Sequence, residues 1–400
     1  MNIRNSSRQA AALAACFLSS AVLAVAQSPA PATPRSATPP SATPKSALLV
    51  LSKQDHTLAI VDPATLQVVA RIPVGDDPHE VVASSDGRTA YVSNYGFGAF
   101  HTLAVVNLVG QEAEPQIELG ALRGPHGLAF AQGKVWFTAE AAKAIGSYDP
   151  LTSKINWIMG TGQNRTHMIY IFPGAEKIVT TNVNSATVTI LEHTAGQAGG
   201  RPPSPPSGPP PANAGPQPNG ASPRRGSGIP PPGTPAPGTR APGGPPPGPP
   251  GGDWNETVIP VGGGSEGFDV TPDGKQAWVA NAWDGTLSVI DIAAKKVTAT
   301  LQANARGANR LKFTPDGARA LVSAGGDLLV FDVRAEKEVK RLHIGTGGGG
   351  GIQMQPDGQR AYVSFAADGF VAVIDLKTLE VVGKINAGGN PDGLAWAAQQ

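Results

Sequence analysis

The chain has very little cysteine: Cys16 is the single one among its 400 residues. A disulfide framework and a cysteine zinc site each need several cysteines, so neither is expected. Covalent c-type haem is excluded for the same reason, because its attachment needs a C-x-x-C-H motif. The sequence therefore identifies no cofactor with certainty. A divalent metal ion held by side chains other than cysteine remains an open alternative.

Acidic residues are absent from two long segments, residues 1–46 and 195–252. The other 296 residues hold all 30 acidic residues and 23 of the 31 basic ones, which gives them a net charge near −7. A folded surface that binds duplex nucleic acid carries a basic stripe, so we expect no duplex nucleic-acid partner. Apolar runs of membrane-spanning length are also absent beyond the N-terminus.

Residues 1–26 are typical of an export signal. Arg4 and Arg8 supply a positive start, an apolar run follows, and Ala24-Val25-Ala26 forms an A-x-A cleavage site. The sequence thus predicts a signal peptide and a periplasmic or secreted protein. Two alternatives stay open: a retained membrane anchor and a lipoprotein anchored through Cys16. The apolar run continues past Cys16, which argues against the lipoprotein.

Two segments are rich in proline. Residues 27–46 have the Pro/Ala/Thr composition of a stiff tether. Residues 195–252 contain 21 Pro and 15 Gly, and such a segment cannot bury enough apolar surface to offset its ordering entropy, which predicts a disordered insertion. Its proline runs could bind a partner as polyproline II, although a tolerated surface insertion is the simpler interpretation.

An internal repeat predicts the fold. Pro-Asp-Gly turns start at Pro272, Pro315 and Pro356, so the period is 43 residues and then 41. Each unit contains four short apolar runs separated by turns, and Pro-Asp-Gly suits a tight hairpin turn. Four strands in about 42 residues are the blade of a β-propeller.

The number of units follows from the remaining length. Residues 47–194 and 253–400 divide into seven units, of which the first, Leu48–Ile72, lacks its innermost strand. Residues Gly393–Ala398 supply a matching strand at the other end. The sequence therefore predicts one all-β domain over 47–400, a monomeric seven-bladed propeller of four-stranded antiparallel blades, closed by the C-terminal strand.

Three stretches resemble the YVTN-repeat β-propeller family: Ala90-Tyr91-Val92-Ser93-Asn94, Ala277-Trp278-Val279-Ala280-Asn281 and Ala361-Tyr362-Val363-Ser364. The resemblance covers nearly all of 47–400 except the insertion. It implies the fold, and it implies export because family members are typically exported. Similar propellers occur in surface-layer proteins, in lactonases and in the haem domain of cytochrome-type nitrite reductases, so the resemblance selects no single function.

The turn before each innermost strand lines one mouth of a propeller's channel. His79, His126 and His167 stand at this position in three successive units. Imidazoles there could bind a metal, act as a general base or hold an anion, whereas the structural alternative is that they cap the strand start. Titratable residues occur at most of these turns, and the predicted ligand-binding residues are His79, His126, His167, Arg165, Glu266, Arg310 and Asp392.

One unit is also similar to a repeat of the streptogramin lyase family, through Pro125-His126-Gly127 and Trp136–Glu140. That family opens a lactone ring by elimination with a metal held near the channel. The resemblance implies His126 and Glu140 as catalytic and metal-binding residues. The sequence departs from the family at Gly124, where the family has an acid, so one metal ligand is missing.

Two classes of function follow from these patterns. The first is an exported propeller that binds a small molecule or a protein at the channel mouth and performs no chemistry. The second is a metal-assisted lactonase or lyase that uses His126 and Glu140. We favour the binding protein, because the acidic metal set is incomplete.

Overall fold

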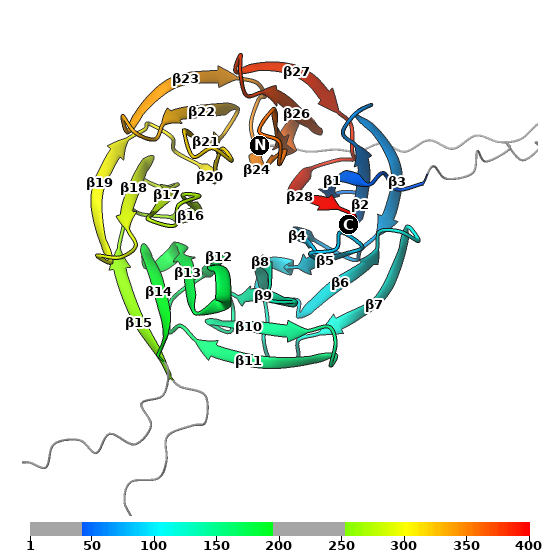
Figure 1. The fold of residues 1–400 in the computed structure, drawn as a ribbon, viewed down its shortest axis with the longest axis horizontal. Helices are drawn as coiled ribbons and strands as arrows, with labels where there is room; N and C mark the ends of the chain where they lie inside the picture. Colours follow the sequence, from blue (N-terminus) through cyan, green and yellow to red (C-terminus); the bar gives the residue numbers. More distant parts are fainter. Residues whose placement is uncertain (1–41, 195–252) are drawn as a thin grey trace, which may run out of the picture. The chain divides into compact units, whose positions relative to one another are not determined.

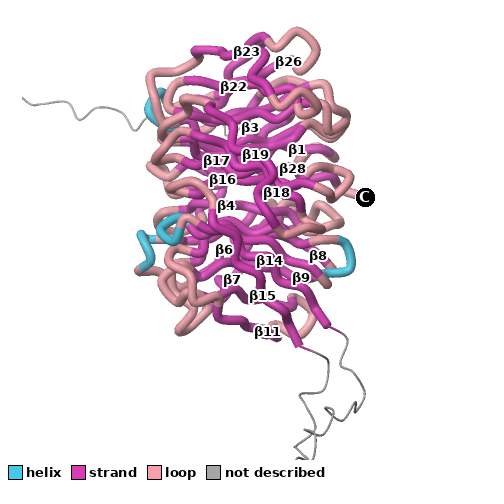
Figure 2. Tube along the Cα trace, turned by 90° about the vertical axis from the view of Figure 1, so that its left-hand side faces the viewer, coloured by secondary structure: helices cyan, strands magenta, loops and turns pink. Residues whose placement is uncertain are grey.

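Seven four-stranded antiparallel sheets surround a central axis as blades (Figure 1). The computed structural model describes residues 42–194 and 253–400. The predicted signal peptide and the proline-rich insertion lie outside the described residues, as do residues 27–41 of the predicted tether. The predicted seven-bladed propeller is confirmed. Loops and turns lie on the two faces of the ring, with the strands between them (Figure 2).

The blades are numbered along the chain, and their strands are given from the centre outward. Blade 1 consists of β4 (Pro78–Ala83), β5 (Thr89–Asn94), β6 (Thr102–Asn107) and β7 (Glu112–Glu118). Blade 2 consists of β8 (Pro125–Ala131), β9 (Lys134–Ala139), β10 (Ala144–Asp149) and β11 (Lys154–Gly160). Blade 3 consists of β12 (Thr166–Ile171), β13 (Lys177–Asn182), β14 (Thr187–Thr194) and β15 (Asp253–Pro260). Blades 4 to 7 are β16 (Ser265–Val270), β17 (Gln276–Asn281), β18 (Thr286–Asp291) and β19 (Lys296–Gln302); β20 (Ala308–Phe313), β21 (Arg319–Ala324), β22 (Asp327–Asp332) and β23 (Lys337–His343); β24 (Gly349–Met354), β25 (Arg360–Phe365), β26 (Phe370–Asp375) and β27 (Glu380–Ile385); β28 (Pro391–Ala398), β1 (Ser46–Ser52), β2 (Thr57–Asp62) and β3 (Gln67–Pro73).

Helical structure within 42–194 and 253–400 is limited to four single turns of 3-10 helix. They are η1 (Gly96–Gly98), η2 (Pro173–Ala175), η3 (Val183–Ser185) and η4 (Ala366–Asp368). In this part of the chain no helix is both long and apolar enough to cross a membrane. The proline-rich insertion leaves after β14 and returns at β15, so both of its ends are attached to the outer strands of blade 3.

The Pro-Asp-Gly segments form the tight turns that the repeat predicts. In the first of them Asp273 accepts a hydrogen bond from the N–H of Lys275 at 3.1 Å, and Gly274 takes a positive φ of 72°. Aspartate stabilises such a turn through its own backbone, and glycine adopts positive φ without steric cost. The other two segments repeat both features.

The two ends of the propeller chain meet in blade 7, as predicted. The C-terminal strand β28 is the innermost strand of that blade and pairs antiparallel with β1, with Leu394 opposite Val50 and Trp396 opposite Leu48. Leu48 and Val50 are fully buried and share one apolar cluster with Leu394. The C-terminal strand therefore closes the ring and removes an open sheet edge.

Hydroxyl groups on the second strands join neighbouring blades near the axis. The Ser93 hydroxyl accepts from the N–H of Glu80 in its own blade at 3.0 Å and donates to the carbonyl of His126 in the next blade at 2.9 Å. We call a second-strand hydroxyl that donates to a carbonyl of the next blade a hydroxyl bridge, and the others are Thr138, Thr181, Ser323 and Ser364. Ala280 and Leu51 occupy the equivalent positions of the remaining two blades, so five of seven junctions are bridged.

Ring closure predicts a large loss of stability when residues 393–400 are removed. Burying one large apolar side chain stabilises a fold by about 1.5–3 kcal/mol, so losing Leu394 and Trp396 alone costs several kcal/mol. The loss of the β28–β1 ladder adds to this. We expect a sharply lower melting temperature by circular dichroism, and a control that lacks only Gln400 should melt like the full chain. A chain without residues 393–400 that melts at the same temperature as the full chain would contradict ring closure by the C-terminal strand.

Candidate functional site

The innermost strands share an irregularity where they begin. In each of the seven blades the pairing with the second strand shifts register within the first four residues. Such a β-bulge interrupts the alternation of side chains and re-aims them. In blade 1 it allows two consecutive residues to reach the channel: His79 packs against His126, and Glu80 pairs with Arg310.

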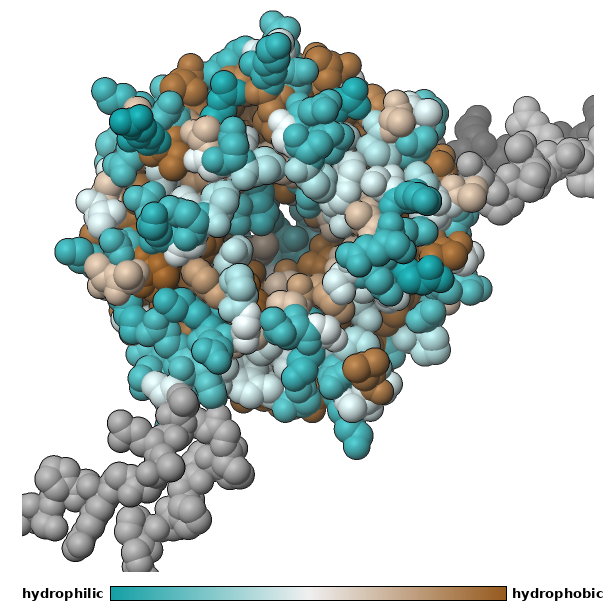
Figure 3. Space-filling model, in the orientation of Figure 1, coloured by the Kyte–Doolittle hydropathy of each residue, from teal (hydrophilic) through white to brown (hydrophobic). Residues whose placement is uncertain are grey.

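The three histidines predicted at successive strand starts form one row. The ring centroids of His79 and His126 are 4.2 Å apart, and those of His126 and His167 are 3.8 Å apart. Tyr95 packs against the first two rings, with both centroid distances at 5.1 Å. The structure thus brings together residues from β4, β8 and β12 where these innermost strands begin. The space-filling view shows the central hollow of the ring (Figure 3).

His167 lies between two carboxylates. Its Nδ1 is 2.5 Å from Oε1 of Glu140, which directly follows β9, and its Nε2 is 2.6 Å from Oε2 of Glu266 on β16. Arg165 contacts both acids, with its Nη1 at 3.1 Å from Glu266 and its Nε at 3.4 Å from Glu140. The Tyr95 hydroxyl donates to the second oxygen of Glu140. Both carboxylates are therefore held from two sides.

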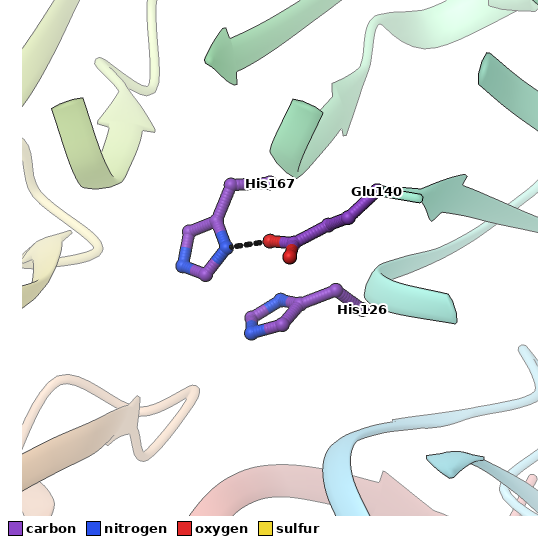
Figure 4. A group of neighbouring side chains, drawn as sticks. All are labelled: His126, Glu140 and His167. Carbon is purple, nitrogen blue, oxygen red and sulfur yellow. Dashed lines mark hydrogen bonds and ion pairs between the residues drawn. The ribbon is translucent and has the colours of Figure 1, made fainter. Parts of the chain in front are cut away.

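His126 differs from its neighbours because its imidazole has no hydrogen-bond partner among the described residues. The side chain is fully buried, and neither ring nitrogen finds a hydrogen-bond partner among the described residues. Figure 4 shows its ring beside Glu140 and His167. One ligand atom from each of the three residues lies within 4.8 Å of the others. Two imidazoles and a carboxylate at this spacing could hold a metal ion.

The remaining predicted residues, Asp392 and Arg310, come from blades 7 and 5. The Lys53 ammonium donates to Nδ1 of His79 and is 2.9 Å from Asp392. Arg310 of β20 forms an ion pair with Glu80 of β4, across the ring (Figure 1). Both of these side chains line a cavity of about 290 Å³ bounded by all seven innermost strands. The three histidines do not line this cavity.

All eight residues singled out from the sequence therefore lie at one mouth. Three further residues belong to the cluster and were not predicted: Glu80, Tyr95 and Lys53. Glu80 follows His79 directly, and strict strand alternation places it on the opposite face, so only the bulge brings it into the channel. Tyr95 and Lys53 come from the loops after β5 and β1. Both residues could have been predicted from their position, because each follows the second strand of its blade, as Glu140 does.

Burial governs the protonation of the histidine row. It lowers the pKa of His79 to about 3, against the opposing attraction of Asp392. Burial and the neighbouring His167 hold the pKa of His126 well below its ordinary 6.5. For His167 burial again lowers the pKa, but Glu266 and Glu140 outweigh it, and the pKa is raised. The row thus combines two neutral imidazoles with one imidazolium between two acids.

These shifts predict acid sensitivity through His79. Its pKa is lower in the folded protein than in the unfolded chain, so below pH 6.5 the unfolded chain binds more protons. The stability of the fold therefore decreases as the pH is lowered. One pKa unit corresponds to about 1.4 kcal/mol, so the loss from His79 between pH 6.5 and 5 is about 2 kcal/mol. His167 acts with the opposite sign, because its raised pKa adds stability below 6.5 that is lost as pH rises.

The test measures the free energy of unfolding by urea titration at pH 7 and pH 5 in the presence of a chelator. We expect His79→Asn to lose about 2 kcal/mol less than the wild type between these two pH values. The exposed His343, whose side chain is 82% accessible, provides the control His343→Asn, which should follow the wild type. An unchanged pH dependence in His79→Asn would show that this histidine is not held neutral.

Comparisons with known proteins agree with the fold. Residues 2–149 match the model of the YNCE-like beta-propeller family, and no curated protein matches. A functionally unknown protein from Desulfotomaculum acetoxidans is similar in structure, with a TM-score of 0.63, 14% identity, and coverage of 88% of this chain and 99% of that chain.

Two solved structures of known activity are similar as well. Hydrazine synthase of Kuenenia stuttgartiensis has a TM-score of 0.57 at 14% identity, over 80% of this chain and 89% of that chain. The dihydro-heme d1 dehydrogenase NirN, in complex with DHE, has a TM-score of 0.55 at 15% identity, over 88% and 75%. At such identities these likenesses concern the fold alone. They do not test the lyase-like blade, which stays a prediction, whereas the resemblance of the chain to YVTN-type β-propellers is confirmed.

Proposed function

We propose that this chain is an exported binding propeller that holds a divalent metal ion and a small ligand at the channel mouth. His126, Glu140 and His167 would hold the metal, and His167 would release its Nδ1 proton when the ion binds. The observation that carries the proposal is His126, whose two ring nitrogens are fully buried and lack hydrogen-bond partners among the described residues. A buried polar group without a partner is costly, and a metal ion would satisfy it.

The donor set favours a transition metal. Two imidazoles and one carboxylate suit Zn²⁺ or Fe²⁺, whereas Mg²⁺ and Ca²⁺ prefer oxygen ligands. The acid that the streptogramin lyase family has at the position of Gly124 would not fit here. Gly124 has a φ of 69°, and a Cβ added to it would lie 2.9 Å from the Gly98 backbone. His167 of the next blade stands beside Glu140 and completes a different set of three.

The groups around the three ligands also fit a metal site. Metal-binding histidines commonly donate their other N–H to a carboxylate, and Glu266 lies 2.6 Å from Nε2 of His167. Tyr95 and Arg165 orient the Glu140 carboxylate in the same way. A bound divalent ion would supply Lewis acidity toward an oxygen of the ligand. Arg165, with 32% of its side chain exposed, would contact that ligand from solvent.

A metal-assisted lactonase or lyase is the second candidate. His79 favours it, because this imidazole is neutral, its ring is 4.2 Å from that of His126, and Lys53 donates to its Nδ1. Because Nδ1 accepts from Lys53, the ring proton of the neutral imidazole is on Nε2, and this N–H could donate a hydrogen bond to an oxygen of a bound lactone. Metal-dependent opening of a macrocyclic lactone, lost in His79→Asn, would establish this function, and a binding protein would leave the lactone intact.

Zinc titration of the purified chain tests the metal site. We expect about one equivalent of Zn²⁺ to bind in calorimetry, and His126→Ala to weaken binding by more than about 100-fold, because it removes a ligand rather than a supporting group. His343→Ala on the outer strand β23 is the matched control and should bind like the wild type. Unchanged zinc binding in a folded His126→Ala protein would refute the assignment.

A further inference from the structure

We propose that Thr138 is the positioning residue of the metal site, because its one hydroxyl connects the chain segments of all three ligands. This inference rests on the proposed metal site. Thr138 is fully buried on β9. Its hydroxyl accepts from the N–H of Gly127 at 2.9 Å and donates to the carbonyl of His167 at 2.7 Å. Gly127 directly follows His126, and Glu140 lies two residues beyond Thr138.

The other hydroxyl bridges do not have this property. Ser93 holds the carbonyl of His126 but is bonded to no other ligand segment. Thr181 accepts from the N–H of Met168, which follows His167, and donates to the carbonyl of Glu266, so it is bonded to the segment of one ligand. Ser323 and Ser364 hold Gly350 and Asp392, at blades that supply no metal ligand. Thr138 is therefore the bridge whose loss would loosen two of the ligand backbones at once.

Close packing makes this position sensitive. A Cβ added to Gly127 would lie 2.5 Å from the His167 carbonyl oxygen, so the two strand starts are almost in contact. Removing the hydroxyl leaves the Gly127 N–H and that carbonyl without this partner, and the strand starts can separate. A metal site tolerates displacements of only about 0.5 Å in its ligands. Loss of outer-shell support typically weakens metal binding by about 10–100-fold.

The experiment compares two identical substitutions at different ends of the propeller. Thr138→Val removes the bridge and keeps the side-chain shape. Thr314→Val is the control, because the buried Thr314 hydroxyl also accepts a backbone N–H, from Arg319 at 3.0 Å, at the opposite end of blade 5. It donates to Asp316 at 2.6 Å and to the Arg319 carbonyl at 3.2 Å. Thr138→Ser retains the hydroxyl. The readouts are zinc affinity by calorimetry and the melting temperature of the metal-free protein.

We expect both valine variants to lower the metal-free melting temperature to a similar extent. Zinc affinity should fall by about 10–100-fold in Thr138→Val alone, and Thr138→Ser should bind zinc like the wild type. The inference is overturned when Thr138→Val binds zinc as tightly as the wild type, or when Thr314→Val weakens binding equally.

The zinc affinity of the wild type distinguishes failure of the proposed function from failure of this inference. Absence of zinc binding in the wild type overturns the proposed function and this inference together, whereas normal wild-type binding with an unaffected Thr138→Val overturns the inference alone. Should Thr138→Val not fold, Ser93→Ala takes its place, because among the ligand segments it releases only that of His126. It should then weaken zinc binding less than tenfold but measurably, and unchanged affinity refutes the role of the bridges.

Discussion

The close approach of the innermost strands at the channel is the constraint on which the rest of the structure depends. Seven strand starts share one axis, and four of them carry a glycine whose added Cβ would lie 2.4–2.5 Å from the backbone of the next blade: Gly127, Gly267, Gly351 and Gly393. Glycine is needed there because no side chain fits. The same proximity lets a hydroxyl of one blade bond to the carbonyl of the next, so that packing and hydrogen bonding fix the spacing between blades together.

This spacing concentrates polar groups where little water reaches them. Buried charges are expensive unless paired, and the channel mouth meets that demand with ion pairs: Arg310 with Glu80, Lys53 with Asp392, and Arg165 with Glu140 and Glu266. Burial keeps His79 and His126 neutral, and two carboxylates keep His167 charged. Within the described residues of the cluster His126 is the ring that no such pairing satisfies, which is why we place the metal beside it.

The sequence alone led to the fold and to most of the cluster, because both follow from the repeat. Once the Pro-Asp-Gly turns set the register, every strand start could be aligned, and His79, His126 and His167 had to meet. The bulge could not be foreseen from alternation, so Glu80 was missed together with its ion pair to Arg310, 230 positions away. Nor could the hydroxyl bridges be assigned, since a serine or threonine in a strand shows its partner only when the neighbouring blade is in place.

Anomalous diffraction tests the central claim, a metal held by His126, Glu140 and His167, most directly. Crystals grown with Zn²⁺ would be measured at energies on both sides of the zinc absorption edge. The account predicts one strong anomalous peak at the channel mouth, about 2.0–2.2 Å from a nitrogen of each histidine and an oxygen of Glu140. A protein that crystallises with zinc but shows no peak there, with His126 still without a partner, would contradict it.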